Sequence, residues 1–77
     1  MTRQFNENIK NSEIELFIDE YVRLETHRQM LKDKWFKGMS LEAIAEKYRI
    51  SLTATKNVIY GIGDKVLLKL NAEKRPN

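Results

Sequence analysis

The chain has 77 residues, of which 42% are hydrophobic and none is cysteine, and it carries a formal net charge of +3 at pH 7. This length allows one small domain, and the lack of cysteine excludes both a disulfide framework and a thiolate zinc site. No run of about 18 apolar residues occurs, and the N-terminal MTRQFNENIK lacks the apolar centre of a signal peptide, so we expect a cytoplasmic protein with no membrane partner.

The charge is distributed unevenly along the chain. Residues 1–46 contain seven Lys or Arg against nine Asp or Glu, whereas residues 47–77 contain seven against two. The second part therefore has a net charge of +5, which favours a polyanionic partner at one end of the molecule. A solvated basic surface is the simpler explanation of the same pattern.

The first predicted helix follows a polar, aperiodic stretch, residues 1–11, which we expect to form a loose arm. Phe5 and Ile9 are the arm residues able to dock on the domain. Ser12 and Glu15 have the spacing of a capping box, so the helix should begin at Ser12. Its apolar side chains recur at helical intervals: Ile14, Phe17, Ile18, Tyr21 and Leu24.

A second capping box, from Thr26 to Gln29, predicts a break between two helices at that point. Gly38 is placed to end the second helix. The apolar residues of this helix are Met30, Leu31, Trp35 and Phe36.

The stretch from Ser40 to Ile62 predicts two helices joined by a tight corner. Ser40 should cap the first of them and Ser51 the second. Arg49 occupies the corner, where a left-handed backbone would cost about 1 kcal/mol, and Ile50 should plug the corner. The apolar stripe of the first helix is Leu41, Ile44, Ala45 and Tyr48.

The second helix of this pair has two faces. Val58, Ile59 and Ile62 continue an apolar face. A helix that exposes hydroxyl, amide and ammonium groups together is equipped to contact a DNA groove. The residues of the opposite face are Leu52, Thr53, Lys56, Asn57 and Tyr60.

Two arrangements are open for the C-terminal part. Gly61 and Gly63 each cost up to about 1 kcal/mol inside a helix, yet an apolar stripe of Val66, Leu67 and Leu70 follows them. Either one kinked helix extends over residues 52–71, or Asp64 caps a separate fifth helix. We favour the break, and we expect residues 72–77 to fray. The whole is then a single all-α domain of four to five helices over residues 12–71.

Residues 28–59, RQMLKDKWFKGMSLEAIAEKYRISLTATKNVI, resemble the helix-turn-helix of sigma-factor region four. They are more similar still to short phage and prophage transcriptional regulators of the ArpU/RinA type. The resemblance covers roughly residues 14–70 and implies transcription regulation in a phage or mobile element, with RNA polymerase open as a protein partner. The matching elements are Arg28, Leu31, Trp35, Phe36, 38–40, 42–46, Ile50, Ser51 and 52–60.

Double-stranded DNA is therefore the expected partner, with residues 52–60 as the recognition helix in the major groove. Asn57 suits adenine, Lys56 suits guanine or a phosphate, and the remaining residues suit thymine methyl groups or phosphates. The candidate DNA-binding residues are Ser40, Arg49, Ser51, Leu52, Thr53, Lys56, Asn57, Tyr60 and Lys65.

We expect a homodimer, because paired half-sites raise the affinity of a small module. Exposed parts of residues 17–24 or of residues 66–70 would supply the interface. Two alternatives stay open: a protein-interaction module such as a sigma-like adaptor or inhibitor, and a DNA-packaging small terminase subunit that assembles as a ring.

Catalysis is not expected. His27 has no second ligand one helical turn away, so the sequence predicts no metal site, and no glycine-rich phosphate loop or catalytic triad is present. We therefore expect no cofactor and no enzymatic activity.

Overall fold

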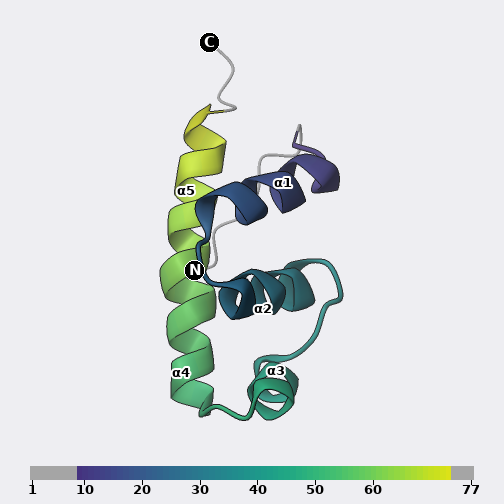
Figure 1. Cartoon of the computed structure of the whole chain (residues 1–77), viewed down its shortest axis with the longest axis vertical. Coiled ribbons are helices and arrows are strands. Elements are labelled where there is room, and N and C mark those ends of the chain that lie inside the picture. Colours follow the sequence, from purple (N-terminus) through teal and green to yellow (C-terminus); the bar gives the residue numbers. More distant parts are fainter. Residues whose placement is uncertain (1–8, 74–77) are drawn as a thin grey trace.

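The computed structural model describes residues 9–73 and confirms the predicted all-α class, with no strand within that range. The last three elements follow one another without interruption and form one helix over residues 52–73, which we name the long helix. Its three elements are α4 (Leu52–Lys56), the π-helical η1 (Asn57–Ile62) and α5 (Gly63–Glu73). The long helix runs the length of the molecule, and three shorter helices lie along one side of it: α1 (Asn11–Tyr21), α2 (Glu25–Trp35) and α3 (Leu41–Tyr48) (Figure 1).

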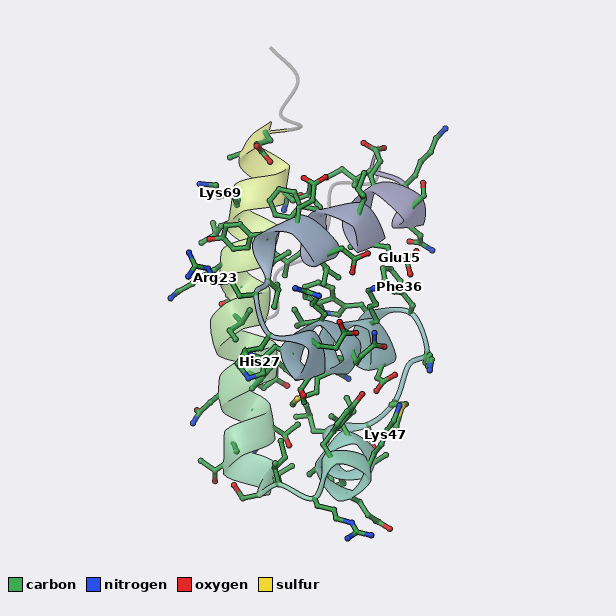
Figure 2. The ribbon with its side chains drawn as sticks, viewed as in Figure 1. Glu15, Arg23, His27, Phe36, Lys47 and Lys69 are labelled. Carbon is green, nitrogen blue, oxygen red and sulfur yellow. The ribbon has the colours of Figure 1, made fainter. Side chains whose placement is uncertain are left out.

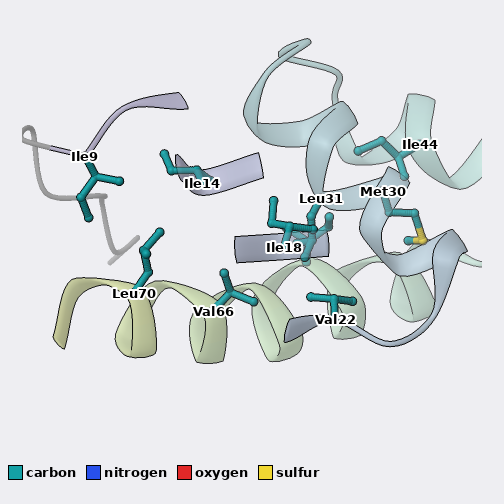
Figure 3. Close-up of a cluster of buried hydrophobic side chains, with 10 residues drawn as sticks. Ile9, Ile14, Ile18, Val22, Met30, Leu31, Ile44, Val66 and Leu70 are labelled. Carbon is teal, nitrogen blue, oxygen red and sulfur yellow. The ribbon is translucent and has the colours of Figure 1, made fainter. Parts of the chain in front are cut away.

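The hydrophobic core lies where α1 and α2 face the long helix (Figure 3). Its buried side chains come mostly from the predicted apolar stripes, each contributing roughly 1.5–3 kcal/mol on burial. Ile9 is among them, so it docks on the domain, whereas Phe5 lies outside the described residues. The core cluster consists of Ile9, Ile14, Ile18, Val22, Met30, Leu31, Ile44, Ile59, Val66 and Leu70.

The start of α1 differs from the prediction. The helix begins at Asn11 and not at Ser12, so ordered structure precedes the expected boundary. Lys10 is the capping residue, and its backbone N–H donates to the Glu13 carboxylate at 3.3 Å. The predicted capping pair is wrong because the earlier start places Glu13, not Glu15, at the third helical position. Glu15 instead faces Lys32 of α2, with 3.8 Å between Oε2 and Nζ.

The break between α1 and α2 is confirmed, but it lies earlier than predicted. Val22 is extended and buried, while Tyr21 and Leu24 are exposed although the sequence places them in the core stripe. The reason is that α1 ends at Tyr21, after which the chain turns and Val22 points into the core. Thr26 is therefore an exposed residue inside α2 and not its cap.

Arg28 holds this corner together. Its Nε donates to the Val22 carbonyl at 2.6 Å and its Nη2 donates to the Arg23 carbonyl at 2.7 Å. Its Nη1 also pairs with Glu25 at 3.0 Å. Two main-chain acceptors left free at the end of α1 are thus satisfied by one guanidinium fork.

The C-terminal end of α2 and the start of α3 follow the prediction. Gly38 has a φ of +69°, and beyond it the Met39 N–H donates to the Asp33 carbonyl at 3.1 Å. The Ser40 hydroxyl then accepts from the Ala43 N–H at 3.1 Å, so Ser40 caps α3 as expected. Left-handed glycine and a serine cap together set the direction of α3.

The favoured prediction of a break before Asp64 is wrong, because Asp64 lies inside α5 and the long helix is continuous there. The Gly63 N–H donates to the Val58 carbonyl, a bond that spans five residues and marks the π-helical segment. The buried residues Thr55, Ile59 and Gly63 follow at four-residue steps. In an α-helix two such steps would rotate the buried face by about 80°. The wider π turn removes this drift, so one continuous helix keeps one face on the core.

The helix also continues to Glu73, so residues 72 and 73 are not part of a frayed tail. Residues 74–77, to which the rest of that prediction applies, lie outside the described part of the chain.

The two glycines of the long helix should respond to alanine with opposite signs. A Cβ at Gly61 meets nothing within 4 Å, so Gly61→Ala should raise the free energy of unfolding by about 0.5–1 kcal/mol. A Cβ at Gly63 lies 3.1 Å from Trp35 Cζ2 and 3.3 Å from Leu31 Cδ2, so Gly63→Ala should lower it by about 1 kcal/mol. Urea denaturation of both variants measures this, and equal effects would contradict the described packing.

Candidate nucleic-acid interface

Two short helices and a three-residue turn form one end of the molecule. α3 packs against α4, and the turn between them consists of residues 49–51. Arg49 has a φ of 56°, which confirms the predicted left-handed corner. Its N–H donates to the Glu46 carbonyl at 3.3 Å, and the Ile50 N–H donates to the Ala45 carbonyl at 3.0 Å. Ala45 is buried, and its small side chain allows the close approach.

The start of α4 is fixed by Ser51 and Thr55. The Ser51 hydroxyl accepts from the Ala54 N–H at 3.0 Å, which confirms the predicted cap. The Thr55 hydroxyl donates to the Ser51 carbonyl at 3.0 Å, and Thr55 is fully buried. Ile50 does not plug the corner, because 36% of it is exposed and Thr55 lies in the interior instead.

The predicted site residues all lie on the surface. Leu52 is 37% and Tyr60 48% exposed, and the long cationic side chains of the set are exposed as well. The hydroxyls of Ser40 and Ser51 each accept one hydrogen bond in a helix cap, and the proton of each hydroxyl remains available to a phosphate. The exposed set is Ser40, Arg49, Ser51, Leu52, Thr53, Lys56, Asn57, Tyr60 and Lys65.

The π-helical segment aligns the exposed residues as it aligns the buried ones. Leu52, Lys56 and Tyr60 are separated by four residues each, and so are Thr53, Asn57, Gly61 and Lys65. Because the wider π turn offsets the drift that four-residue steps have in an α-helix, each set forms a row close to the direction of the helix axis. These two rows, which we name the Lys56 row and the Asn57 row, form the exposed face of α4 and η1, and the Asn57 row continues to Lys65 in α5.

A buried ion-pair cluster holds α3 against α2. Asp33 is fully buried, and its Oδ2 accepts from Tyr48 OH at 2.7 Å and from Lys47 Nζ at 2.9 Å. Lys37 Nζ lies 3.3 Å from Oδ1. Burial alone would raise the pKa of Asp33, but the hydrogen bonds from Tyr48 and Lys47, together with the nearby ammonium group of Lys37, outweigh it and hold that pKa below the ordinary 3.8.

The sequence pattern does not mark Asp33 as a buried residue. In the chain it stands between two lysines, a context typical of a solvated helix surface. The one available signal was that Asp33 follows Met30 by three residues and therefore shares its buried helix face. Asp33 links α2 to α3, and it therefore helps to fix the orientation of α3, and of α4 packed against it, relative to α2.

Cations on the two sides of the molecule differ in their partners. Lys32 is engaged by Asp19 at 2.7 Å across α1 and α2, and Lys47 is engaged by Asp33 (Figure 2 labels Lys47). Within residues 9–73, the side chains of Arg49, Lys56 and Lys65 form no ion pair. The exposed face of the long helix therefore carries positive charge that the fold itself does not neutralise.

The two segments expected to supply a dimer interface differ in exposure. Val66, Leu67 and Leu70 are buried in the core, so that segment offers only Leu68, which is 50% exposed. On and after α1 the exposed apolar residues are Leu16, Tyr21 and Leu24.

The comparisons add no relatives: no family model, curated protein or solved structure matches this chain. Among residues 9–73, no group of His, Cys, Asp or Glu side chains is arranged to hold a metal ion. In the same range, no helix has the length and apolar character needed to cross a membrane.

Proposed function

We propose that this protein binds double-stranded DNA through a helix-turn-helix formed by α3 and α4, and that it regulates transcription in a phage or mobile element. The observation that carries the proposal is the exposed face of α4 and η1. It combines two aligned rows that carry hydroxyl, amide and ammonium groups, and neither of the rows' lysines forms an ion pair within residues 9–73. Its chemistry matches the base edges and phosphates of a major groove.

The roles of the side chains follow from their chemistry. Asn57 is the candidate for paired hydrogen bonds to adenine, and Lys56 for guanine or a phosphate. Leu52 and Thr53 suit thymine methyl groups at the start of the helix. The hydroxyl of Tyr60 and the cation of Arg49 suit phosphates at the groove edges. Ser40, Ser51 and Lys65 complete the set of phosphate contacts.

A homodimer that reads two half-sites is part of the proposal, because a single small module binds DNA weakly. Leu16, Tyr21 and Leu24 on and after α1 offer the apolar area for such an interface. RNA polymerase is the protein partner that a regulator of this kind would contact. The same exposed leucines support the second candidate, a protein-interaction module that does not bind DNA.

A salt series with random duplex DNA tests the proposal. Wild-type protein should bind at low salt and lose affinity steeply as salt rises, because binding releases counterions. Lys56→Glu should lower the affinity by at least about tenfold, since it replaces an attraction with a repulsion at the groove. Lys10→Glu at the start of α1 is the matched control, with the same charge change away from the proposed face.

Asn57→Ala separates specific from general binding. It should weaken binding to sequences selected from a random pool by about 1–3 kcal/mol and leave random duplex binding nearly unchanged. No wild-type binding at low salt, or equal losses for Lys56→Glu and Lys10→Glu, would favour the protein-interaction module.

A further inference from the structure

A shallow groove lies where the corner between α1 and α2 meets the long helix. Arg23 and His27 line it from the corner and from the first turn of α2, and Ile62 and Lys65 line it from the long helix. We name it the corner groove. Figure 2 shows Arg23 and His27 beside the long helix. Glu20 is the acidic residue among its lining side chains.

The corner groove has a fixed frame. Arg28 binds the carbonyls of Val22 and Arg23 at 2.6 and 2.7 Å, so the main chain that carries the Arg23 side chain is held in place. The side chains of Arg23 and Lys65 are exposed and form no ion pair within residues 9–73. Two cations therefore project from a rigid site without a partner in the described part of the chain.

Lys65 connects the corner groove with the candidate DNA-contacting face. It is the last member of the Asn57 row, which the π-helical segment keeps parallel to the helix axis. Lys65 lies about 12 Å along the helix from Asn57, a distance close to the width of a major groove. When Asn57 contacts base edges in the major groove, Lys65 and the corner groove therefore lie near one of the two sugar–phosphate backbones that border the groove.

Gly61 lies between these two residues in the Asn57 row. It has no side chain, and a Cβ built on it meets nothing within 4 Å. The surface between Asn57 and Lys65 is thus open down to the helix backbone, which allows a nucleic-acid backbone to come close.

We propose that the corner groove binds the sugar–phosphate backbone of the same duplex whose major groove receives α4. Arg23 and Lys65 supply the charge and His27 a ring N–H donor, while Glu20 opposes binding. This inference rests on the proposed function, since it extends the DNA footprint from α3 and α4 to the corner between α1 and α2. The occupant is DNA and not a protein, because the groove continues the row that faces the DNA.

The test compares single-charge variants on random duplex DNA over a salt series. Arg23→Gln and Lys65→Gln should each lower the affinity by about three- to tenfold and reduce the slope of log K against log salt by about 1. Neither should change the ranking of DNA sequences. Glu20→Gln should raise the affinity. Lys10→Gln, which removes an exposed charge at the other end of α1, should leave affinity and slope close to the wild-type values.

Separate outcomes identify which proposal fails. If wild-type protein binds and Lys56→Glu weakens binding, but Arg23→Gln and Lys65→Gln both match Lys10→Gln, the corner groove does not contact DNA and the proposed function stands without its contact from Lys65. If wild-type protein does not bind duplex DNA at low salt, both proposals fail together. Unchanged thermal melting of Arg23→Gln and Lys65→Gln is expected, because both side chains are exposed.

Discussion

Asp33→Asn should lower the free energy of unfolding by about 3 kcal/mol at neutral pH. Asp33 is fully buried, and its carboxylate accepts bonds from Tyr48 and Lys47 and pairs with Lys37. Asparagine has nearly the same size but no charge, and its amide nitrogen cannot accept from any of these donors. The loss is large because the change removes the buried negative charge that pairs with Lys47 and Lys37 and turns an NH2 donor toward one of these donors.

Urea denaturation measures this effect, with Asp19→Asn as the control. Asp19 also pairs with a lysine, at 2.7 Å from Lys32, but 46% of its side chain is exposed. The loss for Asp19→Asn should therefore stay below about 1 kcal/mol. Equal losses for the two variants would show that Asp33 does not link α2 to α3 as described.

The stabilisation by Asp33 should vanish in acid. Because the folded-state pKa of Asp33 lies below the unfolded value of 3.8, the folded protein takes up this proton less readily than the unfolded chain. The contribution is therefore complete above that unfolded value and is lost as the pH falls through the folded pKa. The difference between wild-type and Asp33→Asn protein should be constant from about pH 5 to pH 8 and shrink below about pH 4.

Arg28→Met should lower the free energy of unfolding by about 2–3 kcal/mol. Methionine keeps much of the apolar stem but removes the fork that satisfies the Val22 and Arg23 carbonyls. Val22 is buried, so its carbonyl would lose its partner where water has little access. Urea denaturation of the variant gives the value.

Arg28→Lys provides the comparison for this prediction. Lysine keeps the charge but presents one ammonium group, so it can satisfy one of the two carbonyls and should recover only part of the lost stability. Full recovery by lysine would mean that charge alone, and not the planar fork, stabilises the corner between α1 and α2.

Local signals along the chain predicted much of the fold. The serine caps of α3 and α4, the left-handed Arg49 and the positive φ of Gly38 each depend on residues within one helical turn, so the sequence contains all the information. The apolar spacing likewise identified Ile14, Ile18, Met30, Leu31 and Ile44 as core residues.

Features that depend on contacts between helices were missed. One continuous helix through Gly61 and Gly63 was the less favoured of the two predicted arrangements, because the fit of Gly63 against Trp35 and Leu31 of α2 is not visible in the local sequence. Asp33 looked like a solvated residue because its partners Lys47 and Tyr48 lie on another helix. Arg28 was singled out only as an element of the family resemblance. Its bonds to the Val22 and Arg23 carbonyls depend on how the chain turns between α1 and α2.

The site shows the same division. Helical spacing placed Leu52, Thr53, Lys56, Asn57 and Tyr60 on one exposed face, and all of them are exposed. The corner groove could not be predicted, because Arg23 and Lys65 are far apart in the chain and meet only through the packing of α1 and α2 on the long helix.

The most direct measurement of DNA binding through the exposed face of α4 and η1 is an NMR titration of the isotopically labelled protein with duplex DNA at low salt. The largest amide shifts should fall on Thr53, Lys56, Asn57 and Gly61, followed by the corner groove at Arg23 and Lys65. Shifts confined to the groove between α1 and α5 that Leu16 and Glu73 line, or no shifts at all, would contradict DNA binding through the exposed face of α4 and η1.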